Sequence, residues 1–231
     1  MKMLLFITFA PILILALYIY WRDKYEKEPI GLLLMALLLG ALIVIPIIFV
    51  ETWLGDYWET KFGNKLTGDV ATLASAAYVA FIVAAFTEEA FKYLAFFYFW
   101  RNRNFNELFD GIVYAVFISL GFAAVENALY VLAEDGGITV GMLRAVTAVP
   151  AHALFGVAMG YYFSLAKFEP KHRTKYLFLA LLIPIALHGI YDFILMAENE
   201  LLFLLFVPYI IVLWISALKR MRLHSNNSVF K

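Results

Sequence analysis

Seven apolar stretches, each about long enough to cross a bilayer, dominate this sequence. A membrane-spanning helix needs about 20 mostly apolar residues, and we expect such helices at 3–20, 30–50, 71–100, 108–133, 142–166, 176–197 and 201–218. The chain is 64% hydrophobic and only 16% charged, and a soluble domain could not bury that much apolar surface. The sequence therefore predicts an all-α, polytopic transmembrane helical bundle.

The connections between these stretches are short, and no internal repeat is visible, so we expect one integral membrane domain over residues 1–231. The longest connection, 51–69, carries aromatic residues at helical spacing among charges. This pattern predicts a short amphipathic helix at the membrane interface. The chain has no cysteine, which excludes disulfides, thiolate metal sites and a catalytic thiol.

The placement of lysine and arginine predicts the orientation. Thirteen basic residues lie in alternate connections and in the C-terminal tail, against four on the opposite side. Basic residues are enriched on the cytoplasmic side of membrane proteins. We therefore expect the N-terminus outside and the C-terminus in the cytoplasm. The balanced net charge also argues against a nucleic-acid partner, because such proteins carry a basic surface.

Ionisable side chains lie well inside four of the apolar stretches. A charge at mid-bilayer depth costs about 2.5–3.5 kcal/mol, so such groups must face one another or a water-filled cavity. With the predicted topology, the six acidic and histidine side chains fall in the middle-to-outer part of the membrane. Each one alone could be structural, as an ion pair or a hydrogen bond between helices, but a shared depth favours a functional site. These residues are Glu88, Glu89, Lys92, Glu126, His152, His188 and Asp192, with Asn127 as a further polar contact between helices.

Carboxylates and histidines without a serine or cysteine nucleophile suggest activated water. A glutamate in an apolar pocket can act as a general base. Histidine and carboxylate side chains can also bind zinc or stabilise an oxyanion directly. The HExxH motif is absent, so a zinc site would need ligands from different helices. The spacing leaves the choice between a metal site and a metal-free site open.

Four sequence blocks resemble the PrsW family of bacterial intramembrane proteases, which is similar to the wider group of CAAX prenyl proteases and Abi-type membrane proteins. The blocks are AFTEEAFKYL, FDGIVYAVFISLGFAAVENALYV, PAHALFGVAMGYY and HGIYDFIL, and they lie within residues 86–195. The resemblance implies a multi-pass protease in the cell membrane of a bacterium. It also implies a single-pass membrane protein as substrate, such as an anti-sigma factor cut at site 1 on its extracytoplasmic side.

The EExxK block implies that Glu88 and Glu89 are essential. We expect Glu88 to be the base that activates water. Lys92 is then the positive partner that makes the acidic pair tolerable inside the membrane.

The other blocks imply roles for residues on three further helices. Phe122 and Glu126 belong to the site, although the wider group commonly has a histidine at the position of Glu126. His188 is catalytic or a metal ligand, and Asp192 stands where the wider group often has asparagine. His152 either binds metal or orients the substrate. The candidate ligands for zinc are therefore Glu126, His152 and His188, with Glu89 as a further candidate.

Two other functions fit part of the pattern. A proton- or ion-coupled transporter also uses buried glutamate and histidine chains, but inverted repeats are not visible. A prenyl-protein peptidase of the CAAX type should open its site toward the cytoplasmic half, whereas the predicted depth here is in the outer half. We therefore expect a membrane-embedded protease that hydrolyses peptide bonds.

Overall fold

The computed structural model describes residues 2–63, 68–133 and 136–231, and the described residues form helices and no strand. This confirms the predicted all-α class. The elements in chain order are α1 (Lys2–Arg22), α2 (Ile30–Leu42), α3 (Val44–Phe62), α4 (Gly68–Tyr78), the π-helix η1 (Val79–Phe86), α5 (Thr87–Trp100), α6 (Leu108–Leu132), α7 (Ile138–Val146), α8 (Ala148–Phe168), the 3₁₀ turn η2 (Pro170–His172), α9 (Arg173–Met196), α10 (Glu200–Phe203) and α11 (Phe206–Asn226).

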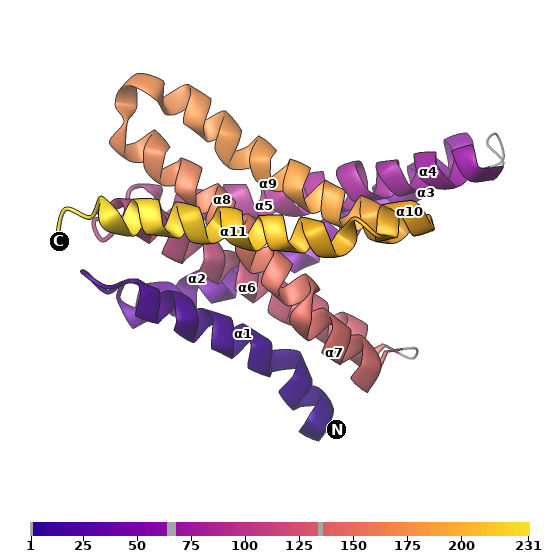
Figure 1. The fold of residues 1–231 in the computed structure, drawn as a ribbon, viewed down its shortest axis with the longest axis horizontal. Helices are drawn as coiled ribbons and strands as arrows, with labels where there is room; N and C mark the ends of the chain where they lie inside the picture. The colour runs from indigo at the N-terminus through magenta and orange to yellow at the C-terminus, as the bar shows by residue number, and fades with distance from the viewer. Residues whose placement is uncertain (1, 64–67, 134–135) are drawn as a thin grey trace.

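Within the described residues, seven helical stretches are long and apolar enough to cross a membrane, which confirms the predicted number of spans. They are Lys2–Arg22, Ile30–Phe62, Thr72–Trp100, Leu108–Leu132, Ile138–Phe168, Pro170–Met196 and Glu200–Asn226. The two termini lie toward opposite ends of the longest axis (Figure 1), as an odd number of spans requires. Which end faces the cytoplasm stays a prediction from the charge bias.

Three of the breaks between consecutive helices lie just before a proline. The breaks at Ile43, at Thr147 and at Leu205 are each followed three residues later by Pro46, Pro150 or Pro208. Proline has no amide hydrogen to donate to the carbonyl four residues earlier, and its ring crowds that carbonyl. These prolines therefore divide single apolar stretches into pairs of helices.

The connection 51–69 differs from its prediction. The structure places residues 51–62 at the end of α3, which continues the stretch begun by α2, rather than in a separate helix. Trp58 stacks on Tyr78 of α4 with ring centroids 4.6 Å apart, and the Tyr78 hydroxyl donates to the carbonyl of Leu54. Residues 64–67 lie outside the described part of the chain. A position of this segment at the membrane interface stays a prediction.

Helix α6 is the centre of the bundle, and 83% of its most apolar 18-residue stretch is buried. It packs against α1, α2, α5, α8 and α11. Glycines allow two of these contacts to be very close: a Cβ atom on Gly121 would lie 2.0 Å from the carbonyl oxygen of Leu37 on α2. One on Gly160 of α8 would lie 2.1 Å from the carbonyl oxygen of Gly111. Small residues at such crossings let membrane helices approach backbone to backbone.

Candidate functional site

Four helices around the middle of the bundle bring the predicted polar residues together. Helix α5 supplies Glu88, Glu89 and Lys92, α6 supplies Phe122 and Glu126, α8 supplies His152, and α9 supplies His188 and Asp192. One ligand atom from each of Glu88, Glu89, His152 and His188 lies within 4.8 Å of the other three. We call these four residues the Glu–His group.

The ammonium of Lys92 lies among three members of the Glu–His group. Its Nζ atom is 3.0 Å from Oε2 of Glu88, 2.8 Å from Oε1 of Glu89 and 3.3 Å from Nδ1 of His152. The same atom stands 4.0 Å above the ring of Phe122. The Lys92 side chain is fully buried, and the carboxylates of Glu88 and Glu89 are its charge partners.

His188 is held between two carboxylates. Its Nδ1 lies 3.0 Å from Oε1 of Glu89, and its Nε2 lies 3.1 Å from Oδ2 of Asp192. A neutral imidazole can donate to only one of these oxygens, whereas an imidazolium donates to both. The ring also stacks on Phe155, with centroids 4.9 Å apart. The position of His188 is therefore fixed on both edges and on one face.

His152 is oriented by Glu126. Its Nε2 lies 2.9 Å from Oε2 of Glu126, and that oxygen also accepts a hydrogen bond of 2.6 Å from Nη2 of Arg144. Because Nδ1 of His152 faces the Lys92 ammonium, its lone pair points into the site. Asn127 lies behind this contact: it accepts from Arg144 and donates to the carbonyl of Thr8 on α1, so it joins helices.

A cleft of about 410 Å³ opens beside the Glu–His group. Glu88, His152, His188, Glu126 and Asp192 line it, together with apolar residues of α3, η1 and α8. Glu89 and Lys92 do not line it, and both are fully buried. The two adjacent glutamates therefore differ: Glu88 borders the open space, and Glu89 is enclosed.

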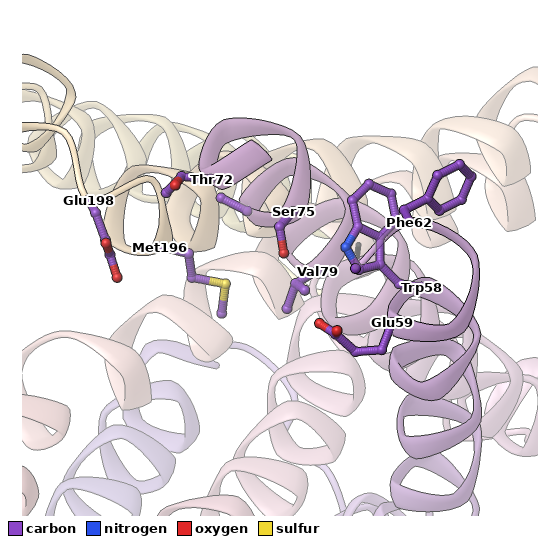
Figure 2. A pocket seen from close by; sticks show the side chains of 10 residues that line it. Trp58, Glu59, Phe62, Thr72, Ser75, Val79, Met196 and Glu198 are labelled. Atoms are coloured by element: carbon purple, nitrogen blue, oxygen red, sulfur yellow. The ribbon is translucent and has the colours of Figure 1, made fainter. Parts of the chain in front are cut away.

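A second hollow of about 480 Å³ lies next to the cleft, and Val79 and Met196 line both. Figure 2 shows Trp58 and Glu59 of α3 on one side of this hollow and Glu198, beyond α9, on the other. These residues lie at the end of the bundle that the charge bias predicts to be extracytoplasmic. Apolar and acidic side chains therefore extend from the cleft toward that end.

Three features of the site were not predicted from the sequence. Arg144, at the start of the predicted span 142–166, was counted only among the four basic residues on the outer side, yet α7 carries it against Glu126. Glu51 looked like the start of a connection, yet it lines the cleft from α3. The π-helix η1 comes directly before Thr87, and π-helical turns are frequent at functional sites. The first two had a signal, namely a charged residue within about one turn of an apolar stretch.

The donor set fits a metal ion. Two imidazoles and two carboxylates suit zinc, and Oε2 of the buried Glu89 finds no hydrogen-bond donor among the described residues. The contact between Glu126 and His152 is the kind that orients a metal-binding histidine. Glu126 itself lies outside the Glu–His group, and its Oε2 contacts Nε2 of His152.

The chain matches known proteins over almost its whole length. A model of the PrsW family intramembrane metalloprotease matches residues 28–217. Protease PrsW of Clostridioides difficile is 40% identical over 99% of this chain and 94% of its own length. The proteins of the same name from Oceanobacillus iheyensis and Bacillus subtilis are 40% and 35% identical, over 95% and 91% of this chain and 95% and 90% of their own lengths.

No solved structure gives a significant match. The relatives are bacterial, and the seven apolar helices make the chain a multi-pass membrane protein. Its activity is that of a membrane protease, which the family model and the relatives share. The chain belongs to the PrsW family of intramembrane metalloproteases.

Proposed function

We propose that this protease cuts a single-pass membrane protein of the anti-sigma-factor type at site 1, near the extracytoplasmic face. The observation that carries the proposal is the cleft bordered by Glu88, His188 and Asp192. Its neighbouring hollow continues toward the predicted extracytoplasmic end. The same position argues against a prenyl-protein peptidase, and family membership favours proteolysis over ion transport.

Glu88 is the general base in this proposal. Its Oε2 lies 3.9 Å from Nδ1 of His188 and 4.0 Å from Nδ1 of His152, too far for a hydrogen bond to either. Glu88 can therefore accept a proton from a water molecule in the cleft while that water attacks the scissile carbonyl carbon. The carboxylic acid so formed returns the proton to the amine as the peptide bond breaks.

His188 is a metal ligand in this proposal. The two carboxylates on either side of its ring hold it at the edge of the cleft. Asp192 is the positioning residue that keeps the ring oriented.

Zinc is the metal that this donor set suits, and His152, His188 and Glu89 would hold it, leaving Glu88 free for water. When bound, it would supply a Lewis acid for the scissile carbonyl. Lys92 contacts two of these residues, Glu89 and His152.

The test is cleavage of a single-pass bacterial anti-sigma factor by the full-length protein in liposomes, with the cut mapped by mass spectrometry. We expect wild-type protein to cut in the extracytoplasmic juxtamembrane segment and Glu88→Gln to leave the substrate whole. The matched control is Glu169→Gln, because Glu169 is an exposed acid in the connection after α8. A cut on the cytoplasmic side, or equal cutting by Glu88→Gln, would contradict the proposal.

A further inference from the structure

A second group of acids is buried at the opposite end of the bundle, which the charge bias predicts to be cytoplasmic. Asp23 and Glu28 lie in the connection between α1 and α2, Glu107 precedes α6, and Asp110 lies in its first turn. All four side chains are at most 2% exposed. We call these four residues the acidic cluster.

The oxygens of the acidic cluster converge. One carboxylate oxygen from each of Asp23, Glu107 and Asp110 lies within 4.8 Å of the other two, and the same holds for Glu26, Glu28 and Asp110. Asp110 is common to both sets. Two oxygens bound to one Ca²⁺ at 2.3–2.6 Å lie at most about 5 Å apart, so these separations suit shared coordination.

Hydrogen bonds hold one oxygen of three of these carboxylates and leave the other oxygen free. Asp110 Oδ2 accepts from the backbone amides of Asn106 and Glu107. Oδ2 of Asp23 accepts from the amide of Glu28, and Oε2 of Glu28 accepts from the Tyr114 hydroxyl. The second oxygens, Oδ1 of Asp23, Oε1 of Glu28 and Oδ1 of Asp110, are buried without a hydrogen-bond partner in the described structure.

No basic side chain neutralises the acidic cluster: among the described residues, none of its members has a salt-bridge partner within 4.0 Å. The nearby Lys27 donates to the backbone carbonyls of Tyr20 and Asp23, and Lys167 donates to that of Trp100. Burial raises the pKa of Asp23 to about 7 and that of Glu28 to about 7, because charge is costly there. A cation between the free oxygens would remove this cost.

We propose that the acidic cluster binds one hard divalent cation, Ca²⁺ or Mg²⁺, with Asp110 as the central ligand. The donor set is made only of oxygens, which suits these ions and not zinc. The cation would join the α1–α2 connection to the start of α6. Through Glu107 it would also be linked to the C-terminal tail, because Glu107 accepts a hydrogen bond from the Ser228 hydroxyl. This site is separate from the Glu–His group and does not depend on the proposed function.

The test is equilibrium dialysis of full-length protein in detergent, stripped with EDTA and then given Ca²⁺ or Mg²⁺ alone. We expect one ion per chain and a dissociation constant raised at least about tenfold by Asp110→Asn. Glu169→Gln, which removes an exposed acid at the same predicted end, should bind like wild type. His188→Ala should also bind normally, because its side chain belongs to the other site.

Asp23→Asn provides the same measurement if Asp110→Asn does not fold. The proposal is supported if one ion of either kind binds per chain and these variants weaken that binding. The ion that binds more tightly identifies the natural ligand class. Three results would overturn it: no stoichiometric binding of either ion at millimolar concentration, equal binding by Asp23→Asn and wild type, or loss of binding in His188→Ala.

Discussion

Exchanging Glu88 for glutamine removes the carboxylate that borders the cleft and keeps the size of the side chain. Glutamine cannot take a proton from water, and general-base catalysis contributes about 10²–10⁴ in rate. We therefore expect kcat to fall by this factor, which corresponds to about 2.7–5.4 kcal/mol in the activation barrier. The amide oxygen of glutamine can still accept from Lys92, which also keeps its 2.8 Å contact with Glu89. The thermal stability should fall by less than in Glu89→Gln, because Glu88 borders the cleft.

The same exchange at Glu89 should act differently. Glu89 is fully enclosed, and its Oε1 accepts from both Lys92 and Nδ1 of His188. Breaking a buried charge pair by removing one partner costs about 3–5 kcal/mol. Glu89→Gln should therefore lower both the activity and the thermal unfolding midpoint, whereas Glu88→Gln, at the edge of the cleft, should lower the midpoint less.

Initial cleavage rates in liposomes and unfolding midpoints in one detergent would measure the two effects on the same preparations. Glu169→Gln again serves as the control. The assignment of the base would be wrong if Glu88→Gln kept a rate within about threefold of wild type. It would also be wrong if Glu89→Gln lost activity at unchanged stability while Glu88→Gln stayed active.

Three further outcomes are expected. Removal of metal by a chelator should abolish cleavage, and zinc should restore it; full activity in metal-free protein would contradict the metal site. Gly160→Val should lower the unfolding midpoint because α6 and α8 touch at this glycine, whereas Gly31→Ala, which has open space, should not; equal midpoints would disprove the close packing. In a chelator, stability should fall as the pH rises from about 4 to 7, because native Asp23 and Glu28 keep protons that the unfolded chain has released; a rise in this range would refute the burial cost.

The number of spans was predictable because each apolar stretch is long enough to be unambiguous. The ends of the spans were less predictable. The stretch that begins at Ile30 runs to Phe62, beyond the predicted end at 50, because the aromatic and charged residues of α3 continue the helix and pack on α4. Polarity marks where an apolar run ends, but a helix can continue past that point.

The meeting of Glu88, His152 and His188 was also predictable, because buried charges in different helices must find partners. The direction of each contact was not. That Glu126 pairs with Arg144 and thereby orients His152 depends on the break before Pro150, which sets the angle of α7. The charge bias counts Arg144 only as a basic residue on the outer side, and hydropathy carries no information on this angle.

The acidic cluster was not predicted, because its members lie in connections where charges usually face water. Asp23 and Glu28 follow a basic residue and precede Pro29, which looks like an ordinary exposed turn. Only the packing of this connection against the start of α6 buries them. Burial of a loop is a property of the tertiary structure, and local sequence does not report it.

The ammonium of Lys92 has a consequence for the order in which this enzyme folds and takes up metal. Small zinc domains remain unfolded until the metal arrives, because nothing else neutralises their ligands. Here the chain carries its own cation at two of the three proposed ligands, Glu89 and His152, so membrane insertion and helix assembly would not have to wait for the proposed zinc. Loading the metal then becomes an exchange of one cation for another in a finished bundle. Its rate should follow the local opening that lets Lys92 withdraw rather than the encounter with the ion.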